Sequence, residues 1–457
     1  MSNQATLELG TKPVGKLLLQ YALPAIIAMV ASSLYNMVDS IFIGQGVGPM
    51  AISGLAITFP FMNLSAAFGA GIGVGSATFL SVKLGQHDYA IANKILANNT
   101  LLNILVGVLF GGISLLFLDP ILRFFGASDV TLPYAREYMF VILLGNAVTH
   151  LYLGLNCLLR AASKPKMAMY LTFLTVILNT ILDPIFIYVF KLGIAGAAYA
   201  TILAQLVALV WQWKMFSNKD ELLHFNYSLF HLEKPIVRNI INIGISPFSM
   251  NACACLVVIF LNNSLASYGG DMAVGAYGIA NRIAFVFVMV TIGVCQGMQP
   301  IVGYNYGAQN YNRMLECLKL AIMASEAICC VGFLVAMFIP GPCARLFTTD
   351  PTLISMSVVA LRYMMAMFFI VGAQIVITNF FQSIGKTKVS IFLSLSRQLL
   401  FLVPSIAILP RFFKLDGVWL SLPTSDCIAT VLALVMMTIY MKKFKALHKQ
   451  INSIKNS

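Results

Sequence analysis

Residues 17–43 read LLLQYALPAIIAMVASSLYNMVDSIFI, and Asp39 is the only charged residue among them. A helix that crosses a bilayer needs about 20 predominantly apolar residues, so this stretch is long enough to span a membrane. The polar residues 1–16 lead straight into it without a small-residue cleavage site. We therefore expect an uncleaved first transmembrane helix and not a signal peptide.

The composition of the whole chain agrees with this first stretch. Of its 457 residues, 59% are hydrophobic and 10% are charged, whereas a soluble domain carries about 25% charged residues. The deficit excludes a soluble globular protein, and the abundance of large apolar residues excludes a disordered one. The net charge of +13 does not indicate nucleic-acid binding, because the basic residues lie in short connections between apolar stretches.

Apolar stretches of spanning length recur along the chain. We expect an all-α integral membrane protein with twelve transmembrane helices in two pseudo-symmetric six-helix bundles. The predicted spans are residues 17–43, 51–82, 93–117, 134–160, 167–190, 194–216, 237–265, 273–302, 316–340, 352–382, 389–411 and 416–441.

The two halves of the chain resemble each other at a nearly constant offset. Met50 matches Met272 and Lys164 matches Lys386, with the same separation along the chain in both cases. Internal duplication is typical of transporters, and the substrate path then lies between the repeats. Because each repeat has six spans, both enter the membrane from the same side and are parallel. The predicted domains are an N-terminal six-helix lobe (1–216), a cytoplasmic linker (217–236), a C-terminal six-helix lobe (237–441) and a basic cytoplasmic tail (442–457).

Lysine and arginine are unequally distributed between the two sides of the predicted membrane. Twenty lie on one side and five on the other. Because positive residues accumulate on the cytoplasmic side, we expect both termini in the cytoplasm. Five lysines of the tail directly follow the last span and suit anionic lipid: Lys442, Lys443, Lys445, Lys449 and Lys455.

Motifs of soluble enzymes are incomplete here. Gly385 to Thr387 form half of a P-loop, but the glycine needed five positions before Gly385 is Phe380. The nine cysteines and five histidines show no metal-binding or disulfide spacing. We therefore expect neither an enzyme nor a cofactor, and transport without an ATPase subunit would draw on an ion gradient. The second span holds four alternating glycines that predict close helix packing: Gly69, Gly71, Gly73 and Gly75.

Asp39 and Asp183 lie deep inside predicted spans of the first half, where an ionisable residue costs a few kcal/mol and indicates a functional site. Asn179 precedes Asp183 by four residues and shares its helix face, and Pro184 follows at once. Oxygen ligands of this kind suit Na⁺ or a proton shared between acids. Polar side chains at similar helical spacing are Tyr35 and Asn36 before Asp39, Tyr152 with Asn156, and Thr201 with Gln205 after Ala197.

The second half does not copy this pattern. Asn262 stands at the position that matches Asp39. Glu326 and Asp426 are equally consistent with cavity residues and with hydrogen bonds between helices. Three arginines lie in spans of this half, which would suit an anionic lipid-linked substrate and therefore a flippase, unless acids or backbone carbonyls pair with them: Arg282, Arg362 and Arg397.

On these residues the sequence resembles the multidrug and toxic compound extrusion (MATE) family over nearly the whole chain. The match is strongest at the cation site that prokaryotic members carry in the N-terminal lobe. The resemblance implies that this site, for Na⁺ or H⁺, comprises Asp39, Asn179, Asp183 and Thr201, with Ala197 contributing its backbone carbonyl. Other branches keep a second acid on the seventh or tenth helix, where this chain has Gln374 and Asn379 on the tenth.

The resemblance also implies a function. We expect a secondary antiporter of the bacterial cytoplasmic (inner) membrane that exports lipophilic, mostly cationic organic compounds by alternating access, as a monomer in lipid. A lipid-linked oligosaccharide flippase is the alternative. The residues expected to line the substrate cavity are Tyr35, Asn36, Tyr152, Asn156, Gln205, Arg282, Gln374 and Asn379.

Overall fold

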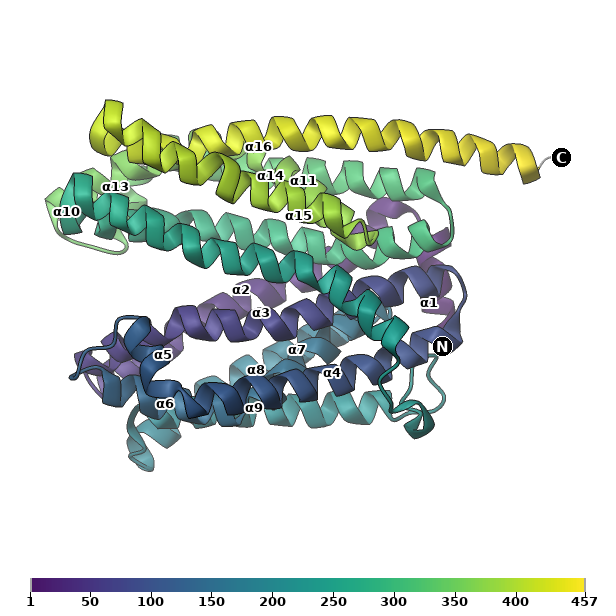
Figure 1. Cartoon of the computed structure of the whole chain (residues 1–457), viewed down its shortest axis with the longest axis horizontal. Helices are drawn as coiled ribbons and strands as arrows, with labels where there is room; N and C mark the ends of the chain where they lie inside the picture. The colour runs from purple at the N-terminus through teal and green to yellow at the C-terminus, as the bar shows by residue number, and fades with distance from the viewer. Residues whose placement is uncertain (1, 456–457) are drawn as a thin grey trace. The chain divides into compact units, whose positions relative to one another are not determined.

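Helices form the chain from end to end (Figure 1). A computed structural model describes residues 2–455, without the side chains at 2–4, 36, 37, 44, 49, 50, 52, 271, 448, 449 and 451–455. No strand occurs in that range, which follows from the need to satisfy backbone groups internally in lipid. The helices are α1 (Ser2–Thr11), α2 (Val14–Gly46), α3 (Pro49–Gly85), α4 (Tyr89–Leu116), α5 (Leu118–Phe124), α6 (Leu132–Leu144), α7 (Asn146–Ala161), α8 (Pro165–Pro184), η1 (Ile185–Val189), α9 (Gly193–Phe216), η2 (Tyr227–Leu229), α10 (Lys234–Gly307), α11 (Tyr311–Phe338), α12 (Pro340–Arg345), α13 (Pro351–Met364), α14 (Phe368–Ser383), α15 (Thr387–Leu395), η3 (Ser396–Leu402) and α16 (Val403–Lys455).

Twelve of the described segments are long and apolar enough to cross a membrane. Nine continuous helices meet this condition, and two bent pairs, α6 with α7 and α13 with α14, each make one more span. The last of the nine, Thr387–Leu447, contains a non-helical residue at Lys414 (φ 51°, ψ −128°) and therefore holds two spans. The predicted number of twelve is confirmed.

Two spans bend at points where the chain has no proline. α6 and α7 meet at 57° around Gly145, and α13 and α14 meet at 55° around residues 365–367. A Cβ at Gly145 would lie 2.6 Å from Cγ1 of Ile202, so the missing side chain lets Ile202 of α9 pack closely against this bend. The hydropathy pattern is continuous across both bends, which is why the sequence predicts unbroken spans there.

The long α10 and α2 helices are each divided between two compact units. The first unit comprises Met1–Thr11 and Ile27–Asn251, and the second comprises Lys12–Ile26 and Ala252–Ser457. The second unit therefore takes its first segment from the start of the chain. Residues 234–251, the beginning of α10, belong in turn to the first unit. The lobe boundaries expected from the sequence stay a prediction.

Equivalent glycines make the same contacts in both units. In the first unit, a Cβ on Gly71 would lie 3.0 Å from the carbonyl oxygen of Gly244. In the second unit, a Cβ on Gly293 would lie 2.7 Å from Cα of Ile26, and Gly297 abuts Ala22 in the same way. Gly71 and Gly293 are separated by the offset of the sequence repeat, and so are Ala22 and Gly244. The repeat in the sequence is thus also a repeat in the way the helices pack.

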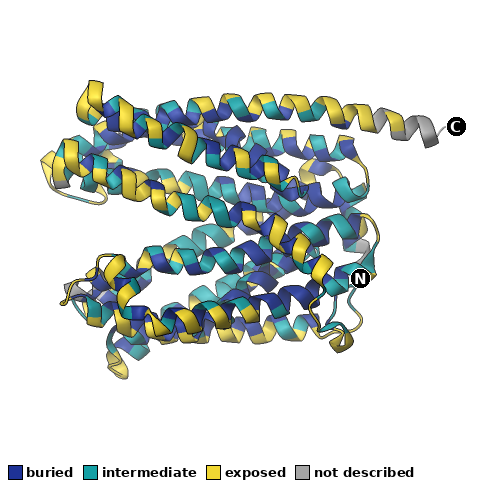
Figure 2. Ribbon diagram, in the orientation of Figure 1, coloured by how far each residue is buried: buried dark blue, intermediate teal, exposed yellow. Residues whose placement is uncertain are grey.

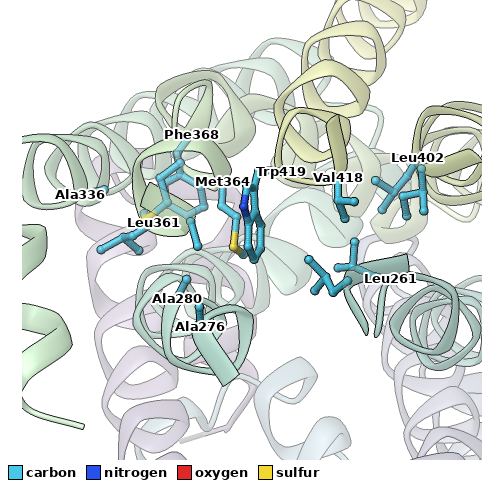
Figure 3. Packing of buried hydrophobic residues seen from close by; sticks show 14 of the residues in the cluster. Leu261, Ala276, Ala280, Ala336, Leu361, Met364, Phe368, Leu402, Val418 and Trp419 are labelled. Carbon is cyan, nitrogen blue, oxygen red and sulfur yellow. The ribbon is translucent and has the colours of Figure 1, made fainter. Parts of the chain in front are cut away.

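Each unit has its own apolar core. In the first unit it gathers around Ile43, Phe61 and Met139. In the second unit Trp419, 1% exposed, lies between Met364 on one side and Val418 and Leu402 on the other (Figure 3).

The outer surfaces of the helices are apolar as well. Buried and exposed positions alternate along the long helices (Figure 2), and many exposed positions hold large hydrophobic side chains such as Leu105, Val210 and Phe412. Soluble proteins rarely expose so much contiguous apolar surface. These faces are suited to contact with lipid.

The connection 217–233 is folded against the first unit. The Asn93 side chain on α4 donates to the carbonyl oxygen of Leu222 (3.3 Å) and accepts from the backbone N–H of His224 (3.0 Å). The Asn98 side chain accepts from the backbone N–H of Glu233 (2.9 Å). These amides satisfy backbone groups that would otherwise need water, so the connection is an ordered part of the first unit.

Candidate functional site

Asn179 connects the two helices that carry the candidate site. From α8 its amide nitrogen donates to Asp183 Oδ1 (3.2 Å) and to Thr201 Oγ1 of α9 (3.1 Å). Asp183 is fully buried and Asn179 is 2% exposed. The four-residue spacing along α8 places both side chains on the face toward α9. Three predicted residues are thus joined in one hydrogen-bonded group.

Asp39 reaches this group from α2. Its carboxyl group and that of Asp183 lie within hydrogen-bonding range of each other. Two ionised carboxylates at this range repel each other, and both are desolvated, since Asp39 is 5% exposed. A proton or a bound cation between the two acids would relieve this repulsion.

Three acceptor oxygens of the cluster have no hydrogen-bond donor among the described residues. They are Oδ1 of Asp39, Oδ2 of Asp183 and Oδ1 of Asn179. Buried polar oxygens are almost always paired in native proteins, because each unpaired one costs on the order of 1–3 kcal/mol. Oxygens from carboxylates, an amide and a hydroxyl form a donor set that fits a hard cation such as Na⁺.

Two tyrosines adjoin the cluster. The hydroxyl of Tyr35 on α2, one helical turn before Asp39, lies within hydrogen-bonding range of Thr201. Tyr138 on α6 is 2% exposed and lies within electrostatic range of both acids. Tyr138 was not among the predicted site residues, although Tyr134, four residues earlier, shares its helix face.

The backbone changes geometry directly after Asp183. Pro184 has no N–H to donate, and residues 185–189 form the π-helical turn η1. Gly196 on α9 packs closely here, since a Cβ there would lie 2.9 Å from the backbone carbon of Phe186. Ala197 follows, fully buried one turn before Thr201. Single π turns recur at functional sites, and this one begins where α8 ends, two residues after Asp183.

The residues expected in the substrate cavity have mostly local partners. Those of the first unit bond to neighbouring helices: Tyr152 to Thr175 (3.3 Å), Asn156 to the Ala168 carbonyl (3.2 Å), and Gln205 to Thr149 (2.5 Å). Asn156 also accepts from Arg160 on its own helix. Those of the second unit bond within their own helix or face outward: Gln374 bonds to Thr378 (3.4 Å), Asn379 bonds to the Ile375 carbonyl (2.9 Å), and Arg282 is exposed. The side chain of Asn36 lies outside the described residues. Their cavity role stays a prediction.

The acids of the second unit have donors. Nε of Arg397 donates to Oδ1 of Asp426 at 2.8 Å. One carboxylate oxygen of Glu326 on α11 accepts from the backbone N–H of Ala373 on α14 (2.7 Å). Both acids therefore connect helices, which agrees with the second of the two roles considered for them, hydrogen bonding between helices.

A second buried polar group of the first unit was not predicted. Ser65 donates to the side chain of Asn146 (2.7 Å) and lies 3.3 Å from Nε2 of His150. The Asn146 side chain also donates to the Gly107 carbonyl (3.2 Å). The four-residue spacing of Asn146 and His150 was a readable signal. The group joins α3, α4 and α7.

Known proteins resemble the chain over most of its length. It is 28% identical to the multidrug export protein MepA of Staphylococcus haemolyticus, covering 92% of this chain and 93% of that protein. It is also 28% identical to MepA of Staphylococcus aureus strain N315, covering 94% of each. A solved multidrug resistance MATE family transporter in an outward-facing conformation superposes with a TM-score of 0.90 at 25% identity, covering 96% of this chain and 98% of that one.

A family model matches the chain twice. The MatE model covers residues 24–185 and 247–407, and the two matches are displaced by the offset that separates the sequence repeats, to within one position. This confirms the internal duplication by an independent route. The two matches together make up well over half of the 457 residues, so the chain belongs to the MatE family, the multidrug and toxic compound extrusion (MATE) transporters.

Proposed function

We propose that this transporter exports lipophilic, mostly cationic organic compounds in exchange for Na⁺ or H⁺, and that the ion binds between Asp39 and Asp183. The MATE family consists of multi-pass membrane transporters and not of enzymes, and its members need no cofactor. The observation that carries the proposal is the pair of buried facing carboxyl groups, with three oxygens that lack a donor among the described residues.

Ion binding would supply energy to the transport cycle through this pair. With the ion bound, the negative charges are compensated. Without it, two desolvated carboxylates repel across the contact between α2 and α8. The loaded and empty forms therefore favour different packings, and the ion shifts their equilibrium by its differential affinity. The Asn179 bridge to Thr201 would transmit the change to α9.

The substrate class is inferred from two sources. Relatives that match over most of their length are named multidrug export proteins. Cationic ligands are favoured by carboxylates together with aromatic faces, and the first unit places Tyr35 and Tyr138 beside its acids. The flippase alternative loses support, because Asp426 neutralises Arg397.

Proteoliposome transport tests the coupling directly. We expect purified protein to move ethidium under an imposed Na⁺ or H⁺ gradient, and the gradient that suffices identifies the ion. Asp39→Asn and Asp183→Asn should each reduce the gradient-driven rate at least tenfold. The matched control is Glu326→Gln, because the glutamine oxygen still accepts from Ala373 N–H. Export near the wild-type rate in the double variant would overturn the proposal.

We further propose that the protein acts as a monomer in a bacterial inner membrane, with both termini and the connection 217–233 in the cytoplasm. The distribution of positive charge supports this orientation. A single cysteine at the exposed Lys219, in a variant without the nine native cysteines, should react with an impermeant thiol reagent only after the membrane is opened. Labelling in intact cells would show that the connection faces outward and that the orientation is opposite to the one proposed.

A further inference from the structure

An apolar groove runs between α3, α4 and the first part of α10, all within the first unit. Its volume is about 340 Å³, within the range of about 300–1,000 Å³ typical of small-ligand sites. Every lining residue is apolar or glycine, and the walls are formed by Ile72, Leu102, Val106, Ile241, Ile245 and Phe248. Ile241 and Ile245 are 44% and 42% exposed, so the groove opens on the outer surface of the helices.

Glycines shape this groove. A Cβ on Gly71 of α3 would lie 3.0 Å from the Gly244 carbonyl oxygen of α10. Because both positions lack side chains, the two helices approach closely and leave space beside α4. The ring centroids of Phe68 and Phe248 lie 4.7 Å apart, and both rings line one end of that space.

The other end carries positive charge. Arg238, Ile241, Ile245 and Phe248 follow one face of α10 at spacings of three and four residues. Arg238 is exposed and makes no ion pair with any residue described. Ten residues separate it from Phe248, a rise of about 15 Å along a helix, which is half of a hydrocarbon core of about 30 Å.

A second basic residue flanks the same end on α4. Lys94 lies about two helical turns before Leu102 on α4. It forms an ion pair with Glu233 (2.9 Å). Lys234, exposed, directly precedes this part of α10. Three basic residues against one acid leave this end of the groove positive.

We propose that the groove binds one anionic phospholipid, with an acyl chain between Ile72, Val106 and Ile245 and the phosphate at Arg238. The length of the groove fits a chain from one leaflet, its walls offer no polar partner, and its open end supplies the countercharge. A bound chain would fill the space that the glycine contact leaves, and so would hold the start of α10 against the first unit. The inference is independent of ion coupling, because it uses none of the residues of the cation cluster.

Native mass spectrometry of the full-length protein tests this inference, with phosphatidylglycerol and phosphatidylcholine of identical acyl chains as probes. We expect one retained phosphatidylglycerol and a preference over phosphatidylcholine of at least fivefold. Arg238→Gln should remove about fivefold of that affinity, since one basic residue near a membrane surface contributes about 1 kcal/mol. The matched control Lys219→Gln removes an exposed positive charge outside the groove and should have no effect.

Variants that fill the groove test the contact with the acyl chain separately from the contact with the phosphate. Ile245→Trp should abolish retention of both lipids, and Val106→Phe provides a second filling variant if the first folds poorly. Ile259→Trp, on an exposed position of α10 outside the groove, should leave retention unchanged.

Three results would overturn the proposal. They are equal retention of the two lipids, retention unaffected by both filling variants, and displacement of the lipid by ethidium at concentrations that the protein transports. The last would make the groove an entry route for substrate. Ethidium transport in these variants is read separately, so failure of the lipid site does not bear on the role of Asp39.

Discussion

The two units place their buried acids differently. In the first, Asp39 and Asp183 face each other, and each has an oxygen without a donor in the described structure. In the second, the acids lie apart: Arg397 neutralises Asp426 at 2.8 Å, and Glu326 accepts from the Ala373 N–H with one oxygen while its other oxygen has no donor among the described residues. The repeats share their helix packing down to equivalent glycines, yet they differ in this electrostatic respect.

The difference separates a structural from a functional use of charge. An acid with a fixed partner holds two helices together and gains nothing from an external cation. An acid that lacks a partner is costly until a cation arrives, and its occupancy therefore changes the energy of the unit. Duplication supplied two similar frames, and among the described residues the first brings two buried acids together, which is the arrangement that the proposed ion coupling uses.

The largest expected effect comes from breaking the fixed pair. Asp426→Asn leaves the Arg397 guanidinium without its carboxylate, which in buried pairs costs about 3–5 kcal/mol. We expect a matching loss of unfolding free energy in SDS titration of the protein in mixed micelles. The double variant Arg397→Met, Asp426→Leu should recover most of it. A single variant as stable as the wild type would show that the pair is not structural.

The next effect comes from giving the second unit the acid that it lacks. Asn262→Asp places a carboxylate within a span at the position equivalent to Asp39, where the penalty is about 2.5–3.5 kcal/mol. We expect lower stability in the same titration and no rescue of transport when it is combined with Asp39→Asn. Restored transport would mean that the second unit retains a complete ion site.

A smaller effect of opposite sign is expected in the first unit. Asp39→Asn removes one of two repelling carboxylates, so the unfolding free energy should stay constant or rise by about 1–3 kcal/mol, while transport is lost. Thr201→Val is a useful companion, because it removes an acceptor for Asn179 and keeps both acids. A loss of stability in Asp39→Asn comparable to that of Asp426→Asn would erase the contrast between the units.

The smallest effect concerns the folded connection. Glu233→Gln breaks the ion pair with Lys94, in which the two side chains are 22% and 35% exposed, and such partly exposed pairs contribute about 0–1 kcal/mol. Asn98→Ala removes the acceptor for the Glu233 N–H and should cost more. Hydrogen exchange at residues 222–233 would measure both variants. Wild-type protection in Asn98→Ala would show that the connection is ordered by other contacts.

Hydropathy and helical spacing predicted most of the frame and the centre of the site. They predicted the twelve spans and the shared helix face of Asn179 and Asp183, because residues four apart on a helix share a face. The grouping of Thr201 with these two residues came from the resemblance to the MATE family. The bend at Gly145 was missed, since hydropathy responds to composition and not to direction. At this bend Gly145 contacts Ile202, which lies on a later helix far along the chain.

Contacts between segments that are distant along the chain could not be predicted from the sequence either. The pairing of Arg397 with Asp426 was one of several open alternatives, because spacing within one helix does not identify partners on another. Asn93 and Asn98 looked like ordinary polar residues near the start of a span, although they bind the backbone of residues 222–233. Tyr138 follows Tyr134 by four residues, but their helix carries no amide or aspartate of the kind that marked the predicted site.

The exchange of helix segments between the units also constrains biosynthesis. Residues 12–26 leave the ribosome early, yet the rest of their unit begins at residue 252, so this segment is inserted long before its packing partners are synthesised. The first unit in turn stays unfinished until residue 251 has been translated. A translational pause within 217–233 would therefore expose two incomplete cores to chaperones and proteases. A gene divided at this connection would encode two fragments, each lacking a segment that the other carries.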